Sequence, residues 1–160
     1  MILVSTDGSC LRNPGGAIGW AWVNHDGTVA SGGAASGTNQ LAELMALQDA
    51  IESHPGEEPL QIESDSKYAI QCASVWVTGW KRKGWRTASG SPVQNLAQVQ
   101  GIARAIADRV GPVGFTWVRG HVGNEFNEQA DVLAGQAARK ALTFPAPPST
   151  TPLLDSDLLF

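Results

Sequence analysis

The sequence predicts an α/β fold in which helices cover both faces of a five-stranded mixed sheet. Three short apolar segments within residues 2–36 are separated by turn signals, a pattern typical of an antiparallel meander. After residue 39, helical and strand patterns alternate, which is typical of parallel strands joined by right-handed crossovers. Together the two patterns predict a sheet that begins antiparallel and continues parallel.

The meander occupies the first part of the chain. Residues 2–6 (ILVST) predict a short buried strand that ends at Asp7, where a Gly-Ser turn follows. Residues 17–25 predict the second strand, which runs into the hairpin signal Asp26-Gly27. Residues 28–36 return as the third strand.

The alternating part begins with a helix from about Asn39 that ends at His54. Its apolar residues recur at helical spacing, namely Leu41, Leu44, Leu47 and Ile51. Residues 60–64 predict the fourth strand, and Asp65 follows it. Ser66 is a candidate cap for a helix that reaches about Val77 and that Gly79 ends. A basic, Trp-rich segment of one or two helical turns and a loop comes next.

The last part predicts two helices, over residues 96–110 and 128–141, on either side of a fifth strand at 113–119. The apolar residues that mark the first of these helices are Leu96, Val99, Ile102, Ile106 and Val110. After residue 142 the composition changes to Pro, Ser and Thr. We therefore expect one folded domain over residues 1–142 and a disordered Pro-rich tail over 143–160 with an acidic-apolar tip.

Composition restricts the class of protein. The chain has 160 residues, of which 42% are hydrophobic and 16% charged, which fits one compact domain. Only two cysteines occur, Cys10 and Cys72, which excludes a disulfide scaffold and a zinc finger and suits a reducing compartment. We see neither a signal peptide nor an apolar run long enough to span a membrane. We therefore expect a soluble, cytoplasmic protein without a membrane partner.

The charge distribution favours nucleic acid more than the net charge does. The net charge of −4, from 11 Lys and Arg against 15 Asp and Glu, argues against a polyanionic partner. Residues 76–86, however, gather four cations and half of the tryptophans: Lys81, Arg82, Lys83 and Arg86 beside Trp76, Trp80 and Trp85. Such a local patch is compatible with binding to phosphates and bases.

Four acids stand at positions where a solvated charge is unusual. Asp7 and Asp65 each follow an apolar strand, so parallel pairing would place both carboxylates at one edge of the sheet. Glu43 and Asp131 lie among apolar residues of two helices. If the four meet, cations must offset their repulsion, and oxygen ligands suit Mg²⁺ or Mn²⁺. Taken singly, each acid is more often a turn or cap residue, and spacing alone does not bring them together.

Six segments resemble, in order, those of type 1 ribonuclease H, and of its bacterial members with a basic handle in particular. The resemblance covers roughly residues 2–141, and the segments are TDGSC at 6–10, NQLAEL at 39–44, ESDS at 63–66, GWKRKGW at 79–85, GHVGNE at 120–125 and NEQAD at 127–131. The resemblance implies a ribonuclease H-like fold. It also implies an endonuclease that hydrolyses the RNA strand of RNA/DNA hybrids, leaving 5′-phosphate and 3′-hydroxyl ends.

The resemblance also implies roles for individual residues. Metal-binding and catalytic roles fall on Asp7, Glu43, Asp65 and Asp131, with two Mg²⁺ ions expected and Mn²⁺ as a substitute. Glu43 would also contact the 2′-hydroxyl that distinguishes RNA from DNA. His121, between glycines in a loop, would move a proton or assist product release.

Contacts with the hybrid are implied at two places. Near the first helix they are Asn13, Thr38 and Asn39; in the basic handle they are Trp80, Lys81, Lys83 and Arg86. Trp76 and Trp85 would pack the handle onto the body. Lys67 departs from the glutamine common in relatives, so it would contact phosphate or compete with the metal.

Two other functions stay open from the sequence. One is an integrase-like or exonuclease-like nuclease of the same fold, in which the acids fall in a different order. The other is a hybrid-binding module without chemistry, against which the four acids and His121 argue. We expect a monomer. The tail ends in Leu158-Leu159-Phe160 after acidic residues, which resembles peptides that dock onto replication proteins; an unselected terminus is an equal alternative.

Overall fold

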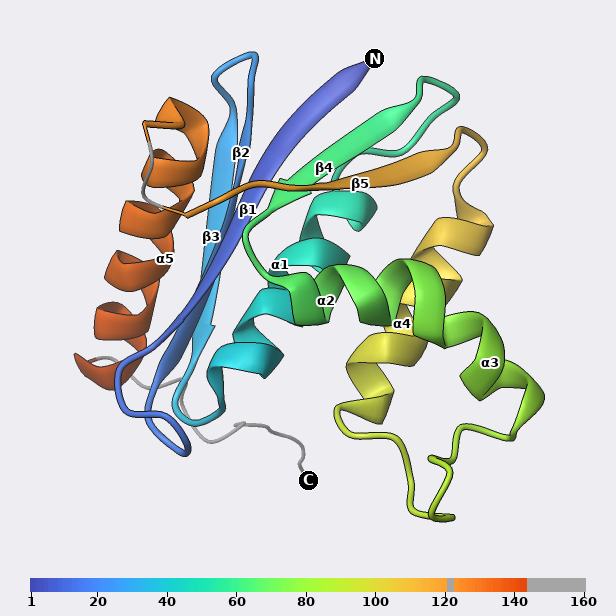
Figure 1. The fold of residues 1–160 in the computed structure, drawn as a ribbon. Helices are drawn as coiled ribbons and strands as arrows, with labels where there is room; N and C mark the ends of the chain where they lie inside the picture. The colour runs from blue at the N-terminus through green and yellow to red at the C-terminus, as the bar shows by residue number, and fades with distance from the viewer. Residues whose placement is uncertain (121–122, 144–160) are drawn as a thin grey trace, which may run out of the picture.

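The fold, taken from a computed structural model, is described for residues 1–120 and 123–143 (Figure 1). Its five strands form one mixed sheet in the order β3-β2-β1-β4-β5. The first three strands pair antiparallel, and β4 and β5 extend the sheet in parallel from β1. The bounds are β1 (Ile2–Cys10), β2 (Ile18–Asn24), β3 (Val29–Ala34), β4 (Leu60–Ser64) and β5 (Val113–Trp117). The predicted α/β class with a five-stranded mixed sheet is confirmed.

Helices cover both faces of the sheet, as predicted (Figure 1). On one face, α5 (Glu125–Thr143) packs against β1, β2 and β3. On the other face, α1 (Asn39–Glu52) packs against β1, β2 and β4, and α4 (Leu96–Asp108) packs on α1. None of the helices in the described ranges is long and apolar enough to cross a membrane.

The two faces are packed differently. The main core of large apolar side chains lies on the face covered by α1 and α4, and it includes Val4, Leu44, Leu47, Ile62 and Ile102. On the opposite face α5 presents small buried residues, Ala130, Ala134 and Ala138. Gly19 of β2 allows this close approach, because a Cβ there would lie 2.2 Å from the carbonyl oxygen of Ala134. The core is therefore one-sided, and α5 lies almost directly on the sheet backbone.

The first strand is longer than predicted. It continues through Asp7 to Cys10, because Gly8 and Cys10 stay paired with Trp20 and Ile18 of β2. The predicted turn after residue 6 is therefore wrong, and Asp7 lies within a strand. Long-range pairing with β2 outweighs the local turn preference of Asp-Gly.

The helix that leads into the basic handle runs past its predicted end. Ser66 caps α2 (Lys67–Gln71) by accepting from the Ala69 backbone N–H, as predicted. The helix then continues through the π-helical segment η1 (Cys72–Trp76) into α3 (Val77–Arg82), so the predicted break at Gly79 is wrong. No atom lies within 4 Å of a Cβ built at Gly79, so only its modest propensity penalty acts there. The helix ends instead before Gly84 and Trp85, which have φ values of 68° and 65°.

Three other boundaries differ. The helix predicted over 96–110 ends at Asp108, and Val110 is 80% exposed rather than part of an apolar helical face. The residues Gly111-Pro112 that follow disfavour helix there. The final helix begins earlier than predicted, at Glu125, and β5 ends at Trp117. Residues 144–160, and with them the predicted disordered tail, lie outside the described residues.

We expect Gly19→Ala to destabilise the fold by about 1–3 kcal/mol, because its methyl group would meet the backbone of α5. Gly79→Ala is the matched control, for which we expect stabilisation of about 1 kcal/mol from helix propensity in open space. Urea unfolding followed by circular dichroism measures both changes. A Gly19→Ala protein as stable as the parent would contradict the close contact between β2 and α5.

Candidate metal centre

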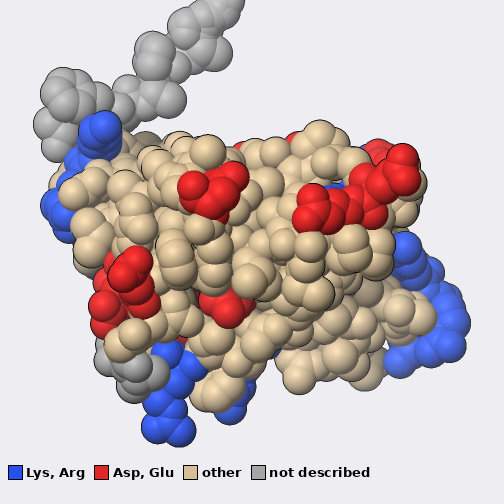
Figure 2. All heavy atoms as spheres, turned by 90° about the horizontal axis from the view of Figure 1, so that it is seen from above, with Lys and Arg blue, Asp and Glu red and all other residues tan. Residues whose placement is uncertain are grey.

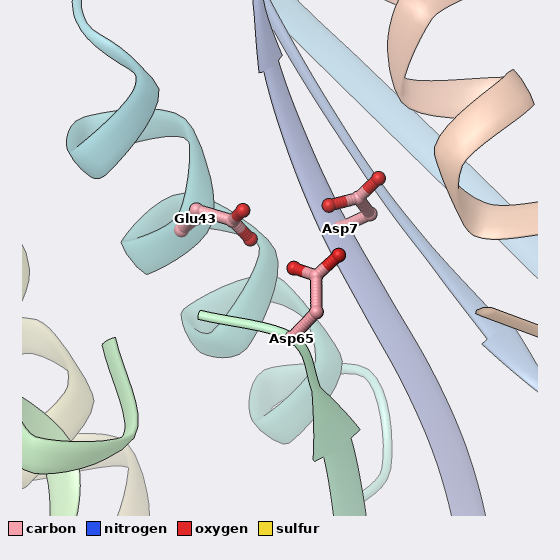
Figure 3. A group of neighbouring side chains, drawn as sticks. All are labelled: Asp7, Glu43 and Asp65. Carbon is pink, nitrogen blue, oxygen red and sulfur yellow. The ribbon is translucent and has the colours of Figure 1, made fainter. Parts of the chain in front are cut away.

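Three carboxylates from separate parts of the chain converge at one place. Asp7 of β1, Glu43 of α1 and Asp65, directly after β4, each offer an oxygen, and these oxygens lie within 4.8 Å of one another. Figure 3 shows the three side chains pointing toward one another from the two strands and the helix. Carboxylate oxygens at this spacing suit a hard divalent cation.

The sheet register brings the two aspartates together. Strands β1 and β4 pair in parallel with Ser5 opposite Glu63, so Asp7 and Asp65 each follow two residues later, Asp7 within β1 and Asp65 just past the end of β4. The same-edge geometry expected from the sequence therefore holds, although Asp7 lies inside its strand.

Glycines make room for the other groups of the site. A Cβ on Gly8 would lie 2.5 Å from the backbone nitrogen of Glu43, so the bare glycine lets α1 approach β1 beside Asp7. A Cβ on Gly120 would lie 2.6 Å from Oδ2 of Asp65. Both glycines therefore belong to the structure of the site, a role that the sequence motifs alone do not reveal.

The fourth acid, Asp131 of α5, joins the group through Asp7. The two side chains are hydrogen-bonded, and the charge of Asp131 acts on Asp7. Asp7 is thus the residue that links Asp131 to the cluster with Glu43 and Asp65. All four acids singled out in the sequence are brought together, whereas spacing alone left their meeting open.

Burial dominates the electrostatics of this centre. Asp7 is only 4% exposed. Burial, the hydrogen bond to Asp131 and the charge of Asp65 together raise the pKa of Asp7 to about 8, against an opposing hydrogen bond from the Gly8 backbone N–H. Burial, followed by the charges of Asp7 and Asp65, also raises the pKa of Glu43 well above its usual range. Without cations the centre therefore retains protons near neutral pH.

One oxygen of Glu43 lacks the partner that burial normally demands. Among the described residues, Oε1 of Glu43 is buried without a hydrogen-bond donor. A buried carboxylate oxygen that has no donor and lies beside other carboxylates is available as a ligand for a cation. A bound ion would take the place of the missing donor and offset the repulsion between the carboxylates. The donor set therefore fits Mg²⁺ or Mn²⁺.

The backbone carbonyl of Asp65 is hydrogen-bonded to a side chain of β5. Nε1 of Trp117 donates to the carbonyl oxygen of Asp65 at 3.1 Å, and Nζ of Lys67 lies 4.6 Å from the centroid of the Trp117 ring. Trp117 is 43% exposed at the end of β5, so it is not a core residue. Lys67, which stands where relatives commonly have glutamine, thus contacts an aromatic ring beside the carboxylate cluster.

The residues that the resemblance assigns to the hybrid fall into two groups. Thr38 caps α1 by accepting from the Leu41 backbone N–H at 3.0 Å, and Oδ1 of Asn13 accepts from the Asn39 backbone N–H at 3.2 Å. These three residues therefore meet at the start of α1, on the helix that carries Glu43. His121 lies outside the described residues.

The second group lies along the handle. Its side chains border a groove of about 440 Å³ whose lining includes Trp80, Lys83 and Arg86. Lys81 belongs to α3 and is exposed. Figure 2 shows one group of basic side chains at the side of the molecule where α3 and α4 lie in Figure 1, and further basic groups at the opposite side.

The tryptophans of the handle differ from one another. Trp80 and Trp85 are partly buried against the main core, so packing of Trp85 is confirmed. Trp76 is 42% exposed and is not among the residues packed against the core, so the prediction that it packs the handle onto the body is wrong. Its ring contacts those of Tyr68 and Trp80 along the helix instead, with centroids 6.3 and 5.8 Å away.

Comparisons with known proteins agree with this geometry. The RNase H family profile matches residues 1–139. Ribonuclease H of Tropheryma whipplei (strain Twist) is 42% identical over 143 residues, covering 89% of this chain and 87% of that protein. Ribonuclease H of Anaeromyxobacter dehalogenans (strain 2CP-C) is 43% identical over 144 residues, covering 84% and 78%.

Solved structures share the fold. LC9-RNase H1, described as a type 1 RNase H with the type 2 active-site motif, superposes with a TM-score of 0.73 at 28% identity, covering 86% of this chain and 72% of that one. The foamy viral protease-reverse transcriptase in complex with RNA/DNA hybrid superposes with a TM-score of 0.71 at 21% identity, covering 86% and 20%. The second likeness concerns the fold alone.

We expect Asp7→Asn to stabilise the metal-free protein at pH 8 but not near pH 4. A carboxyl group whose folded-state pKa is raised stabilises the fold below its unfolded value of 3.8, and this is lost as pH rises toward about 8. The neutral asparagine avoids that loss, so the difference in unfolding free energy should reach on the order of 2 kcal/mol at pH 8. Urea unfolding in EDTA at both pH values measures it.

Asp108→Asn, which removes an exposed carboxylate at the end of α4, is the control. Addition of Mg²⁺ or Mn²⁺ at pH 8 should raise the Tm of the parent and leave that of Asp7→Asn unchanged. An equal gain for Asp7→Asn at both pH values would show that the charge of Asp7 is not what destabilises the metal-free protein.

Proposed function

Because this chain belongs to the RNase H family, we propose that Asp7, Glu43, Asp65 and Asp131 bind the divalent cations with which it cleaves RNA. The chain is an endoribonuclease that acts on RNA/DNA hybrids, and its family is metal-dependent. The observation that supports the four-residue assignment is the convergence of three carboxylates on Asp7 and its hydrogen bond to Asp131.

We propose Mg²⁺ as the cation, with Mn²⁺ as a substitute, because the donors are all carboxylate oxygens. A pair of such ions, when bound, activates the attacking water and stabilises the leaving 3′-oxygen of an in-line displacement. The products would then be 5′-phosphate and 3′-hydroxyl ends.

Asp7 has the central position among the ligands. It hydrogen-bonds Asp131 and clusters with Glu43 and Asp65, so it is the residue able to share an ion with either Asp131 or the other two acids. Its raised pKa means that cation binding must displace a proton from the centre. Burial of Asp7 and Glu43 also keeps bulk water away from the ligand oxygens, which strengthens their attraction for the ions.

Substrate recognition is proposed at the two groups described above. At the start of α1, Asn13, Thr38 and Asn39 would contact the hybrid beside Glu43, which would accept from the RNA 2′-hydroxyl. In the handle, Trp80 would pack against DNA sugars while the cations bind phosphates: Lys81, Lys83 and Arg86. His121 is proposed to move a proton during the reaction. The monomeric state, the cytoplasmic location and docking by the tail stay predictions.

We expect the parent protein to cut the RNA strand of a labelled RNA/DNA hybrid internally and to leave the same strand in an RNA duplex intact. EDTA should abolish the cleavage. Asp7→Asn and Asp131→Asn should each lower kcat about 100-fold or more, or about 2.7 kcal/mol of barrier, while retaining hybrid binding. Tight hybrid binding by the parent without cleavage in either metal would favour a binding module instead.

We expect Lys81→Ala and Lys83→Ala to weaken hybrid binding through the loss of phosphate contacts. Each should raise KM about 3- to 10-fold at 150 mM salt and lower the salt slope of binding by about 1, with little change in kcat. Lys140→Ala, on α5, is the control, since that helix covers the other face of the sheet from α1. Equal salt slopes for the handle variants and the parent would contradict the assignment.

A further inference from the structure

A polar cluster outside the carboxylate centre joins the sheet to the start of α5. It contains Ser5 of β1, His25 directly after β2, Glu63 of β4 and Asn124 directly before α5. The motifs assign no role to these four residues. Glu63 and Asn124 lie at the edges of two of those motifs, close in sequence to Asp65 and Asp131.

The cluster directs its donors at one oxygen of Glu63. Ser5 and Glu63 are register partners, and Oγ of Ser5 donates to Oε1 of Glu63 at 3.0 Å. Since Ser5 has a single hydroxyl proton, its 3.0 Å contact with Nε2 of His25 makes the imidazole N–H the donor. Ser5 is fully buried, so this Ser, His and Glu set is a structural network and not a nucleophilic triad.

Asn124 connects the network to α5. Its Nδ2 donates to Oε1 of Glu63 at 3.4 Å, while its Oδ1 accepts from the Asn127 backbone N–H at 3.0 Å. The side chain therefore caps the helix with one end and binds the sheet with the other. Phe126 adds a second contact, because its ring stacks on that of His25 with centroids 3.9 Å apart.

The rest of the α5 interface specifies the position of the helix along its axis only weakly. Apart from Asn127 near its start, the buried residues of α5 are alanines, and Gly19 lies opposite them. Small side chains form shallow ridges, so they provide contact area with few interlocking groups. A polar anchor at the start of α5 supplies the missing restraint along the axis.

That restraint bears on Asp131. It follows Asn124 by seven residues, close to two full helical turns, so both lie on the same side of the helix. A shift or tilt at the start of α5 would therefore be transmitted to the carboxyl group that hydrogen-bonds Asp7.

We infer that Glu63 and Asn124 form a positioning pair that fixes the position of α5 along its axis and so holds Asp131 against Asp7. The inference rests on the proposed function, in which Asp131 is a metal ligand. Neither residue of the pair acts on the hybrid itself. The pair works through the helix that carries the ligand.

The test uses variants that break this link from either side. Glu63→Leu removes the acceptor, and Asn124→Ser keeps a capping oxygen but removes the donor to Glu63. Each should lower kcat for hybrid cleavage about tenfold, because small misplacement of a ligand is costly. KM should stay within about twofold, since the handle and the start of α1 are untouched. Glu63→Gln, which keeps an acceptor oxygen, should restore at least about half of the parent kcat.

Gln61→Leu is the matched control. Gln61 precedes Glu63 by two residues on the same face of β4, but its side chain donates to Thr116 of β5 at 2.7 Å and not to α5. Its kcat should equal that of the parent. The double variant Glu63→Leu, Asn124→Ser should be no slower than the slower single variant, because both changes cut one link.

Three results would overturn the inference: parent-like kcat in Asn124→Ser, multiplicative losses in the double variant, or equal losses in Gln61→Leu. If Glu63→Leu does not fold, Asn124→Ser and Glu63→Gln decide the question, with thermal unfolding run in parallel. Asp131→Asn distinguishes failure of the proposed function from failure of the positioning pair. If it leaves kcat unchanged, the proposed function fails; if it is inactive while Asn124→Ser is parent-like, only the positioning pair fails.

Discussion

Repulsion among buried carboxylates is the constraint on which the rest of the structure depends. Asp7 is almost fully buried in β1 and interacts with three other acids, so the metal-free centre is destabilising whenever it is ionised. The fold keeps the acids together by attaching each to an element that is stabilised elsewhere. Glu43 belongs to a helix anchored in the main core, and Asp131 to a helix that lies against three strands.

The order of elements could be predicted from the sequence, and several boundaries could not. Periodicity and turn chemistry were sufficient for β4 and for the start of α1, where local and long-range preferences agree. They failed at Asp7 and at Gly79, where pairing with β2 and continuation through η1 outweigh local signals. Local sequence patterns carry no information about contacts between distant segments, so errors are expected where such contacts outweigh local preference.

The site shows the same division. The parallel relation of β1 and β4 predicted that Asp7 and Asp65 would meet, but no spacing rule predicted that Asp131 would reach Asp7. That meeting came from family resemblance alone. Glu63 went unnoticed because it continues the ordinary alternation of a strand, and its partner Asn124 is distant in sequence. The roles of Gly8 and Gly120 could not be predicted either, because these glycines act by leaving space for neighbouring groups.

The π-helical segment between α2 and α3 has an evolutionary consequence. A π turn holds more residues than an α turn, so a π-helical segment can take up an extra residue inside a continuous helix. In a regular α-helix each residue turns the chain by about 100°, so the same residue without the π turn would rotate α3 and its cations about the helix axis. The backbone of η1 thus sets the direction in which α3 presents its cations relative to the Ser66 cap, independently of the chemistry of the side chains. A single residue gained or lost at this junction would change that direction while the carboxylates stay in place.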